Sequence, residues 1–170
     1  PVDRMGRILP EALPEVSGPT ILIAQAGNVN SGAADPFHPL ADWAERHRAW
    51  MHVDGAFGLW ARASTSTRHQ VEGIERADSW ATDGHKWLNI PYDCGVCLLK
   101  HPEPLRKAMR IEAAYLPRSS WDPGEYSPEC SRRARGVDVC AALASLGRDG
   151  VDQLIASDCA LATQAARALA

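Results

Sequence analysis

Short apolar segments that end in polar or charged residues constrain the fold of this chain more than any other feature. Each is only a few residues long and is bounded by Gly, Pro, Asp or Asn, which is typical of a buried strand rather than a helix. The sequence therefore predicts four strands. They are expected at Thr20–Ala26, Trp50–Val53, Ala77–Thr82 and Gly95–Lys100.

Helical patterns separate these segments. A helix is expected to begin at Asp35-Pro36, because Leu40, Trp43 and Ala44 follow at helical spacing. A second helix is expected over Arg68–Arg76, and a third from His101-Pro102 to about Met109. Strands that alternate with helices indicate an α/β fold with a mainly parallel sheet, whose ligands bind at the carboxyl ends of the strands.

The last third of the chain has a different character. Residues Ser119–Glu129 are rich in Ser, Pro, Asp and Gly, which predicts a long mobile loop. After Arg133 the pattern becomes helical and is expected to break at Gly147, with a second helix from about Val151 to Ala170.

Composition disfavours several classes of function. The net charge is -3 with His neutral, which gives no reason to expect a nucleic acid or an anionic membrane as partner. No apolar run approaches the roughly 18 residues that a membrane span requires. Five irregularly spaced cysteines argue against a disulfide framework, so a cytoplasmic protein is expected. Cys94 and Cys97 fit small apolar strand residues better than half of a zinc site, and no metal site is expected.

Two predicted strand ends carry residues with reactive side chains. Asp54 follows one strand beside small residues, and Lys86 follows another. Either residue alone is more often structural, as a surface lysine or a helix-capping acid. Together they suit pyridoxal 5'-phosphate (PLP), because a lysine amine forms an imine with its aldehyde and a carboxylate keeps its pyridine nitrogen protonated.

The segments around these residues resemble the PLP-dependent group II amino-acid decarboxylases, which include aromatic amino-acid, histidine and glutamate decarboxylases. The resemblance covers about Arg7 to Gly150 and is most specific from Ala77 to Cys94. It implies the central portion of the large domain of a type I, aspartate-aminotransferase-like PLP enzyme. The motifs that carry it are His52-Val53-Asp54-Gly55-Ala56-Phe57, Ala77-Asp78-Ser79-Trp80, His85-Lys86-Trp87-Leu88-Asn89, Pro91-Tyr92-Asp93-Cys94 and Ser131-Arg132-Arg133.

The resemblance also implies roles for individual residues. Lys86 corresponds to the Schiff-base lysine and Asp54 to the partner of the pyridinium nitrogen. Ala56 is expected to pack on one face of the ring, and His85 to lie beside the cofactor phosphate. Asn28 is expected to approach the ring hydroxyl, at a place where many relatives carry Thr.

The sequence departs from the family pattern near the lysine. Glutamate decarboxylases have a hydroxyl residue three positions before the lysine, where this chain has Asp83. Because a carboxylate repels a phosphate, Asp83 is expected to point elsewhere and Thr82 to supply the hydroxyl. A mobile-loop tyrosine that helps to return a proton is expected at Tyr126, with Tyr115 as the competitor and a surface residue without a role as an equal alternative.

The resemblance suggests that parts of the family's fold are missing. The N-terminal part, with its phosphate loop and ring-stacking His, and the small C-terminal domain have no counterpart. The expected organisation is a partial PLP-binding domain over 1–118, a mobile loop over 119–130 and helices over 131–170. The implied activity is decarboxylation of an L-amino acid by a parent that is a homodimer. The alternatives are a cysteine desulfurase, an aminotransferase, or a fragment without activity.

Overall fold

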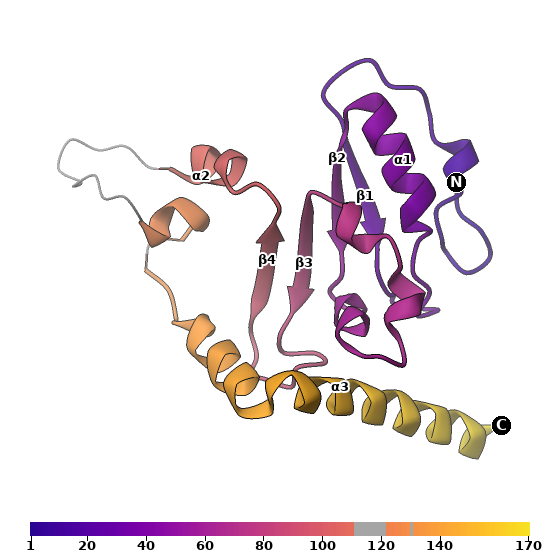
Figure 1. Cartoon of the computed structure of the whole chain (residues 1–170), viewed down its shortest axis with the longest axis vertical. Coiled ribbons are helices and arrows are strands. Elements are labelled where there is room, and N and C mark those ends of the chain that lie inside the picture. Colours follow the sequence, from indigo (N-terminus) through magenta and orange to yellow (C-terminus); the bar gives the residue numbers. More distant parts are fainter. Residues whose placement is uncertain (111–121, 130) are drawn as a thin grey trace.

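The computed structural model describes residues 1–110, 122–129 and 131–170, and its centre is a four-stranded sheet in the order β1-β2-β3-β4 (Figure 1). β1, β2 and β3 are parallel, whereas β4 is antiparallel to β3. A parallel crossover needs a dozen or more residues, and only the loop 84–94 joins β3 to β4. The predicted α/β fold is confirmed. The strands are β1 Ile21–Gln25, β2 Trp50–Asp54, β3 Ser79–Asp83 and β4 Gly95–Leu99.

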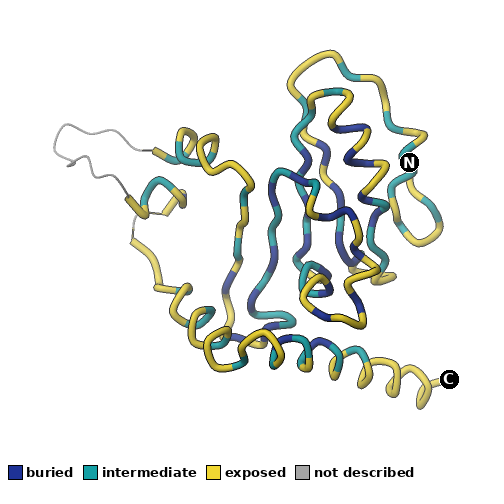
Figure 2. The backbone as a smooth tube through the Cα atoms, viewed as in Figure 1, coloured by how far each residue is buried: buried dark blue, intermediate teal, exposed yellow. Residues whose placement is uncertain are grey.

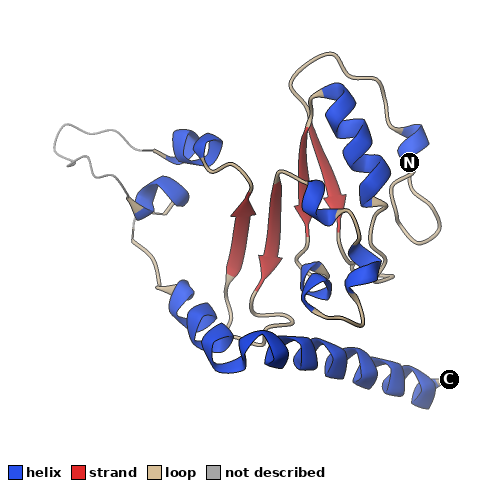
Figure 3. Cartoon of the chain, viewed as in Figure 1, coloured by secondary structure: helices blue, strands red, loops and turns tan. Residues whose placement is uncertain are grey.

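Among the residues that the structure describes, three α-helices and five short 3-10 helices accompany the sheet (Figure 3). Two of the α-helices match the predicted positions after β1 and after β4, and the third follows Arg133 as its pattern indicated. The α-helices are α1 Phe37–His47, α2 Glu103–Met109 and α3 Arg135–Leu169, and the 3-10 helices are η1 Pro10–Ala12, η2 Leu59–Ala63, η3 Arg68–Val71, η4 Ile74–Arg76 and η5 Pro123–Tyr126.

The helix predicted over Arg68–Arg76 is wrong. The segment forms the two short 3-10 helices η3 and η4, and Gly73 lies between them with a φ of 86°. An L-residue rarely adopts this left-handed conformation, and a Cβ at Gly73 would also lie 2.9 Å from the ring of His38. The chain therefore turns at Gly73, where the predicted helix would have continued.

The main core lies between one face of the sheet and α1. Leu22, Ala24, Met51 and Val53 point to this face and are at most 7% exposed. The dark-blue segments of Figure 2 gather in these strands and in α1. We call this the covered face of the sheet, and the opposite one the open face.

α3 runs past the carboxyl ends of β1–β3, as Figure 1 shows at the bottom of the molecule. Gly147 has non-helical backbone angles, so the predicted break falls inside this helix. After the break, the Asp152 carboxylate accepts hydrogen bonds from the Ser64 hydroxyl (2.6 Å) and the Thr65 amide (3.2 Å). These bonds hold the second half of α3 against the segment that follows η2.

No helix in the described part of the chain combines the length and the apolar character that crossing a membrane requires.

Candidate active site

The candidate site lies at the carboxyl ends of β2 and β3. Asp54 pairs with Ala81 in the parallel register, and the Gly55 amide donates to the Ala81 carbonyl (2.8 Å). Since side chains alternate along a strand, Asp54 points to the face opposite Val53, which is the open face. Asp83 comes two residues after Ala81 and therefore shares that face.

Lys86 reaches this edge from the loop 84–94. Its Nζ lies 3.7 Å from the centre of the Phe57 ring, which is a cation–π distance. Phe57 comes three residues after Asp54, so the structure brings the lysine to the loop that follows the strand of Asp54. The Lys86 side chain is 27% exposed, which leaves the amine accessible to a ligand.

Asp54 keeps part of its carboxylate available. The Ala56 amide donates to Asp54 Oδ1 (3.1 Å). The Asp54 backbone carbonyl accepts from the Ala26 amide (2.8 Å). The bond to Oδ1 fixes the side chain, while Oδ2 has no hydrogen bond among the described residues. Ala56 lies beside the carboxylate, and its methyl group takes up little space. Asp54 and Ala56 therefore place a carboxylate next to a small side chain at the end of β2.

The ring of His85 is fixed by backbone atoms. Its Nδ1 lies 3.0 Å from the Cys94 amide and 3.1 Å from the Cys94 carbonyl, which already accepts from the Gly84 amide (2.9 Å). An amide can only donate, so we assign Nδ1 as the acceptor and Nε2 as the atom that carries hydrogen. Nε2 lies 3.7 Å from Asp83 Oδ2 and is thus directed toward the site.

Two further predicted residues lie at the same edge of the sheet but have partners of their own. Thr82 is 4% exposed, and its hydroxyl donates to the Gly55 carbonyl (3.1 Å). Asn28 holds its own loop, because its Oδ1 accepts from the Asn30 amide (2.9 Å) and its Nδ2 donates to Gln25 Oε1 (3.0 Å). Their roles toward a cofactor stay predictions.

The structure does not bring Tyr126 to Lys86. Tyr126 ends η5, and Arg106 of α2 lies 5.9 Å from its ring. α2 follows β4, which runs antiparallel to β3, so η5 and Lys86 lie toward opposite ends of β4 (Figure 1). The role of Tyr126 stays a prediction. The competing Tyr115 and residues 119–121 and 130 of the expected loop lie outside the described residues.

Ion pairs and apolar contacts hold the loop that carries Lys86. The Arg135 side chain donates to Asp93 Oδ1 and to the Asp93 carbonyl, both at 3.1 Å. The hydrogen bond to the carboxylate is the first cause of the lowered pKa of the Asp93 carboxyl. Arg133 donates to the Tyr92 carbonyl (3.1 Å). Beneath the loop, Leu88, Ile90 and Cys94 form a cluster against apolar residues of α3. The helix thereby fixes the backbone on which His85 rests.

Sequence reasoning assigned no role to Phe57 or Arg135, and it expected Asp83 to point away from a bound phosphate. Phe57 contacts the lysine amine, Asp83 lies 2.8 Å from it, and Arg135 holds the loop from a distant helix. Phe57 directly follows Ala56 and Asp83 directly follows Thr82, so adjacency to predicted site residues could have drawn attention to both. The position of Arg135 depends on the tertiary fold.

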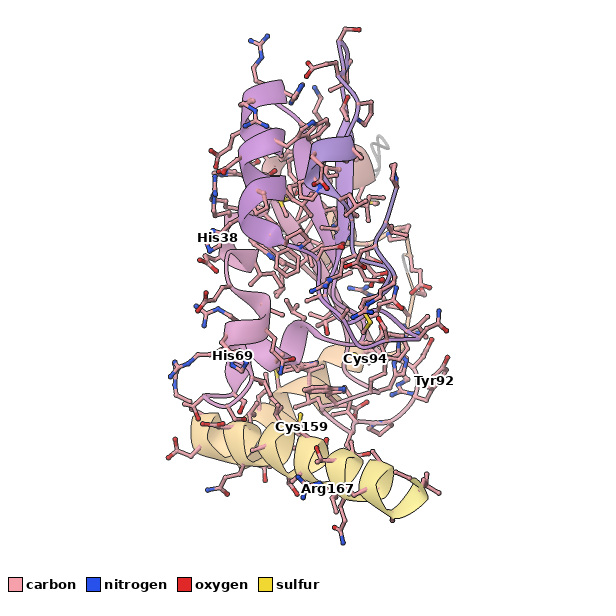
Figure 4. All side chains as sticks on the ribbon, turned by 90° about the vertical axis from the view of Figure 1, so that its right-hand side faces the viewer. His38, His69, Tyr92, Cys94, Cys159 and Arg167 are labelled. Atoms are coloured by element: carbon pink, nitrogen blue, oxygen red, sulfur yellow. The ribbon has the colours of Figure 1, made fainter. Side chains whose placement is uncertain are left out.

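The remaining histidines are separate from this site. Figure 4 shows His38 and His69 on one side of the molecule and Tyr92 and Cys94 on the other. His52 contacts the Ser79 hydroxyl (2.8 Å), in keeping with a structural role. Among the described residues, no group of His, Cys, Asp or Glu has the arrangement of a metal site.

The donor set fits PLP. A partly exposed primary amine can attach an aldehyde, and a carboxylate with one free oxygen can pair with a protonated ring nitrogen. The N–H of His85 adds a hydrogen-bond donor next to them, and Ala56 leaves room for a flat ring. These groups come from two neighbouring strand ends, where ligands bind in open α/β sheets.

Comparisons with known proteins agree with this assignment. Residues 11–170 match the pyridoxal-dependent decarboxylase conserved domain. The chain is 36% identical to an aromatic-L-amino-acid decarboxylase of Bacillus atrophaeus over 86% of its length, and 32% identical to a cysteine sulfinic acid decarboxylase of Mus musculus over 90%. Its fold matches mouse CSAD in apo form with a TM-score of 0.84, at 30% identity and over 94% of this chain and 36% of that one. It also matches Oryza sativa TDC with PLP and tryptamine, with a TM-score of 0.78, at 30% identity and over 85% of this chain and 31% of that one.

The chain belongs to the pyridoxal-dependent decarboxylase family, as its motifs predicted. It spans about a third of the length of the curated relatives: 32% of the Bacillus enzyme and 34% of the mouse enzyme.

Proposed function

We propose that this chain carries the cofactor-holding lysine and the ring-nitrogen carboxylate of a PLP-dependent L-amino-acid decarboxylase. The observation that carries the proposal is the position of Lys86, whose amine lies 3.7 Å above Phe57 at the strand end that presents Asp54. Asp54 ends β2 and Lys86 follows the neighbouring strand β3, and an amine and a carboxylate are the two groups that PLP chemistry requires of a protein.

Each residue of the site has a separate task. When bound, PLP supplies an aldehyde for covalent attachment and a ring that accepts the electrons left behind as carbon dioxide departs. Lys86 holds the aldehyde carbon, and Asp54 keeps a proton on the ring nitrogen. His85 offers its Nε2 hydrogen to an anionic group, while Ala56 and Phe57 shape the space beside the ring.

The same proposal extends to the substrate, the oligomeric state and the cellular compartment. We infer an L-amino acid as the substrate, and relatives named for aromatic and acidic amino acids define the panel to test. We also infer that the full-length protein is a homodimer, as the motifs implied. Four free cysteines among the described residues support a reducing, cytoplasmic compartment.

The test is an amine-release assay on the full-length protein with aromatic and acidic amino acids. Lys86→Ala should abolish steady turnover. Asp54→Asn should lower kcat by roughly 100-fold or more while the fold persists, because the carboxylate acts mainly as charge develops on the ring. Glu72→Gln, which removes one negative charge from an exposed position before β3, is the matched control. Near-normal turnover in Asp54→Asn would refute the proposed role of Asp54.

A further inference from the structure

One carboxylate at the site has no task in the proposed mechanism. Asp83 Oδ2 lies 2.8 Å from Lys86 Nζ, and the two side chains are 24% and 27% exposed. The same oxygen lies 3.7 Å from His85 Nε2. Asp83 therefore touches the atom that would attach the cofactor, and its carboxylate lies between the lysine and the histidine.

The position of Asp83 is set by the sheet. It is the last residue of β3, it pairs with Gly95 of β4, and its backbone carbonyl accepts from the Trp60 indole (3.4 Å). Lys86 lies three residues later in the turn. Because the strand end fixes the Asp83 carboxylate, the flexible side chain of Lys86 has an ionic partner in a fixed place.

A lysine that forms and releases a covalent bond needs a place for its amine while it is free. Resting on the proposed function, we propose that Asp83 is this place: it holds the Lys86 ammonium whenever the lysine is not bonded to the cofactor. Phe57 completes the position, because its ring lies 3.7 Å below the same nitrogen.

The exchange of partners balances in atoms and charge. For attachment, the ammonium loses one proton to solvent and leaves Asp83, and the neutral nitrogen adds to the aldehyde carbon. A carbon–nitrogen double bond then forms as the aldehyde oxygen departs with two hydrogens as water. Asp83 keeps its negative charge throughout. Release of the lysine reverses these changes, and Asp83 again receives the ammonium.

The proposal predicts that Asp83 opposes attachment, because it stabilises the unattached lysine. In Asp83→Asn, a nearly isosteric amide replaces the carboxylate, and the free ammonium loses its ionic partner. At a fixed concentration of aldehyde, the attached fraction of Lys86 should rise by about fivefold, the upper range for a partly exposed ion pair. Asp83→Glu should return the attached fraction toward the original value.

The experiment uses the purified chain and two probes, PLP and pyridoxal without the phosphate. Borohydride reduces each carbon–nitrogen double bond to a stable amine, and mass spectrometry of peptides measures labelling at each lysine. The chain has three lysines, Lys86, Lys100 and Lys107, so the other two serve as internal references. Glu72→Gln is the charge-matched control, and thermal melting confirms that each variant is folded.

The outcomes separate the two proposals. A rise in Lys86 labelling with both probes in Asp83→Asn, absent in Glu72→Gln, supports Asp83 as the holding position. Equal Lys86 labelling in the original chain and in Asp83→Asn overturns it, while selective labelling of Lys86 over Lys100 and Lys107 leaves the proposed function standing. A rise with PLP alone also overturns it, since Asp83 would then act by repelling the phosphate. Labelling of all three lysines to the same extent counts against the proposed function itself.

Discussion

The two faces of the sheet differ in how far they are buried and in which side chains they carry. On the covered face, Leu22 and Val53 are 7% and 0% exposed beneath α1. On the open face, the neighbouring Ile21 and Ile23 are 65% and 61% exposed. The open face also carries the carboxylates of Asp54 and Asp83. Strands of parallel sheets usually have both faces covered, and β1 has apolar residues on both faces. The covered face therefore packs the main core, whereas the open face carries the two carboxylates of the proposed site.

The largest expected effect separates two adjacent residues of β1. Leu22→Ala should lower the free energy of unfolding by about 2–5 kcal/mol, because it leaves a cavity beneath α1. Ile23→Ala should change it by roughly 0.5 kcal/mol or less, because its side chain already contacts solvent. Urea unfolding followed by circular dichroism measures both. Similar losses in the two variants would show that the open face is covered in solution.

A second, smaller effect concerns the loop that carries Lys86. In Arg135→Ala, the loop loses its ionic contact with α3, so the Cys94 amide should exchange its hydrogen about threefold faster. The NMR chemical shifts of the His85 imidazole nitrogens should change as well, since Nδ1 accepts a hydrogen bond from the Cys94 amide. Arg135→Lys should restore part of the effect. NMR measures both signals, and unchanged His85 shifts in Arg135→Ala would show that the loop holds the ring without the helix.

The smallest effect is the pH dependence of Asp152. Hydrogen bonds from Ser64 and then Thr65 lower its folded pKa, so its contribution to stability is present above the unfolded pKa of about 3.9. That contribution is lost as the pH falls through the lower folded pKa. Asp152→Asn should therefore lower the melting temperature slightly at pH 7, and the difference should shrink as the pH falls below about 4. A difference that stays constant across this range would contradict the linkage.

The sequence predicted the strands well because their signal is local. The alternation of buried and exposed residues in β1 and β2 follows directly from side-chain direction along a strand. The helix predicted over Arg68–Arg76 was wrong because Gly73 adopts a left-handed conformation that interrupts it. For the site, the structure places Asp54 at the end of β2 and Lys86 three residues after the end of β3, and their roles toward a cofactor stay predictions.

The contacts of the site were harder to predict. Asp83 was expected to point away from a phosphate, and the structure places it on the amine of Lys86. Tyr126 was chosen for its place in a loop, and the structure places that loop segment beside α2. In both cases the sequence supplied the residue type, whereas packing decided the partner.

By itself, the sequence determined that this protein has an α/β sheet with a carboxylate and a lysine at strand ends, because hydrophobic period and motif spacing are properties of neighbouring residues. Only the tertiary structure decided which polar and charged groups meet when they are far apart in the sequence. Arg135 reaches Asp93 across 42 positions, and Asp152 reaches Ser64 across 88. Such pairs form only after the sheet and α3 have packed, since packing brings together groups that no local pattern along the chain relates.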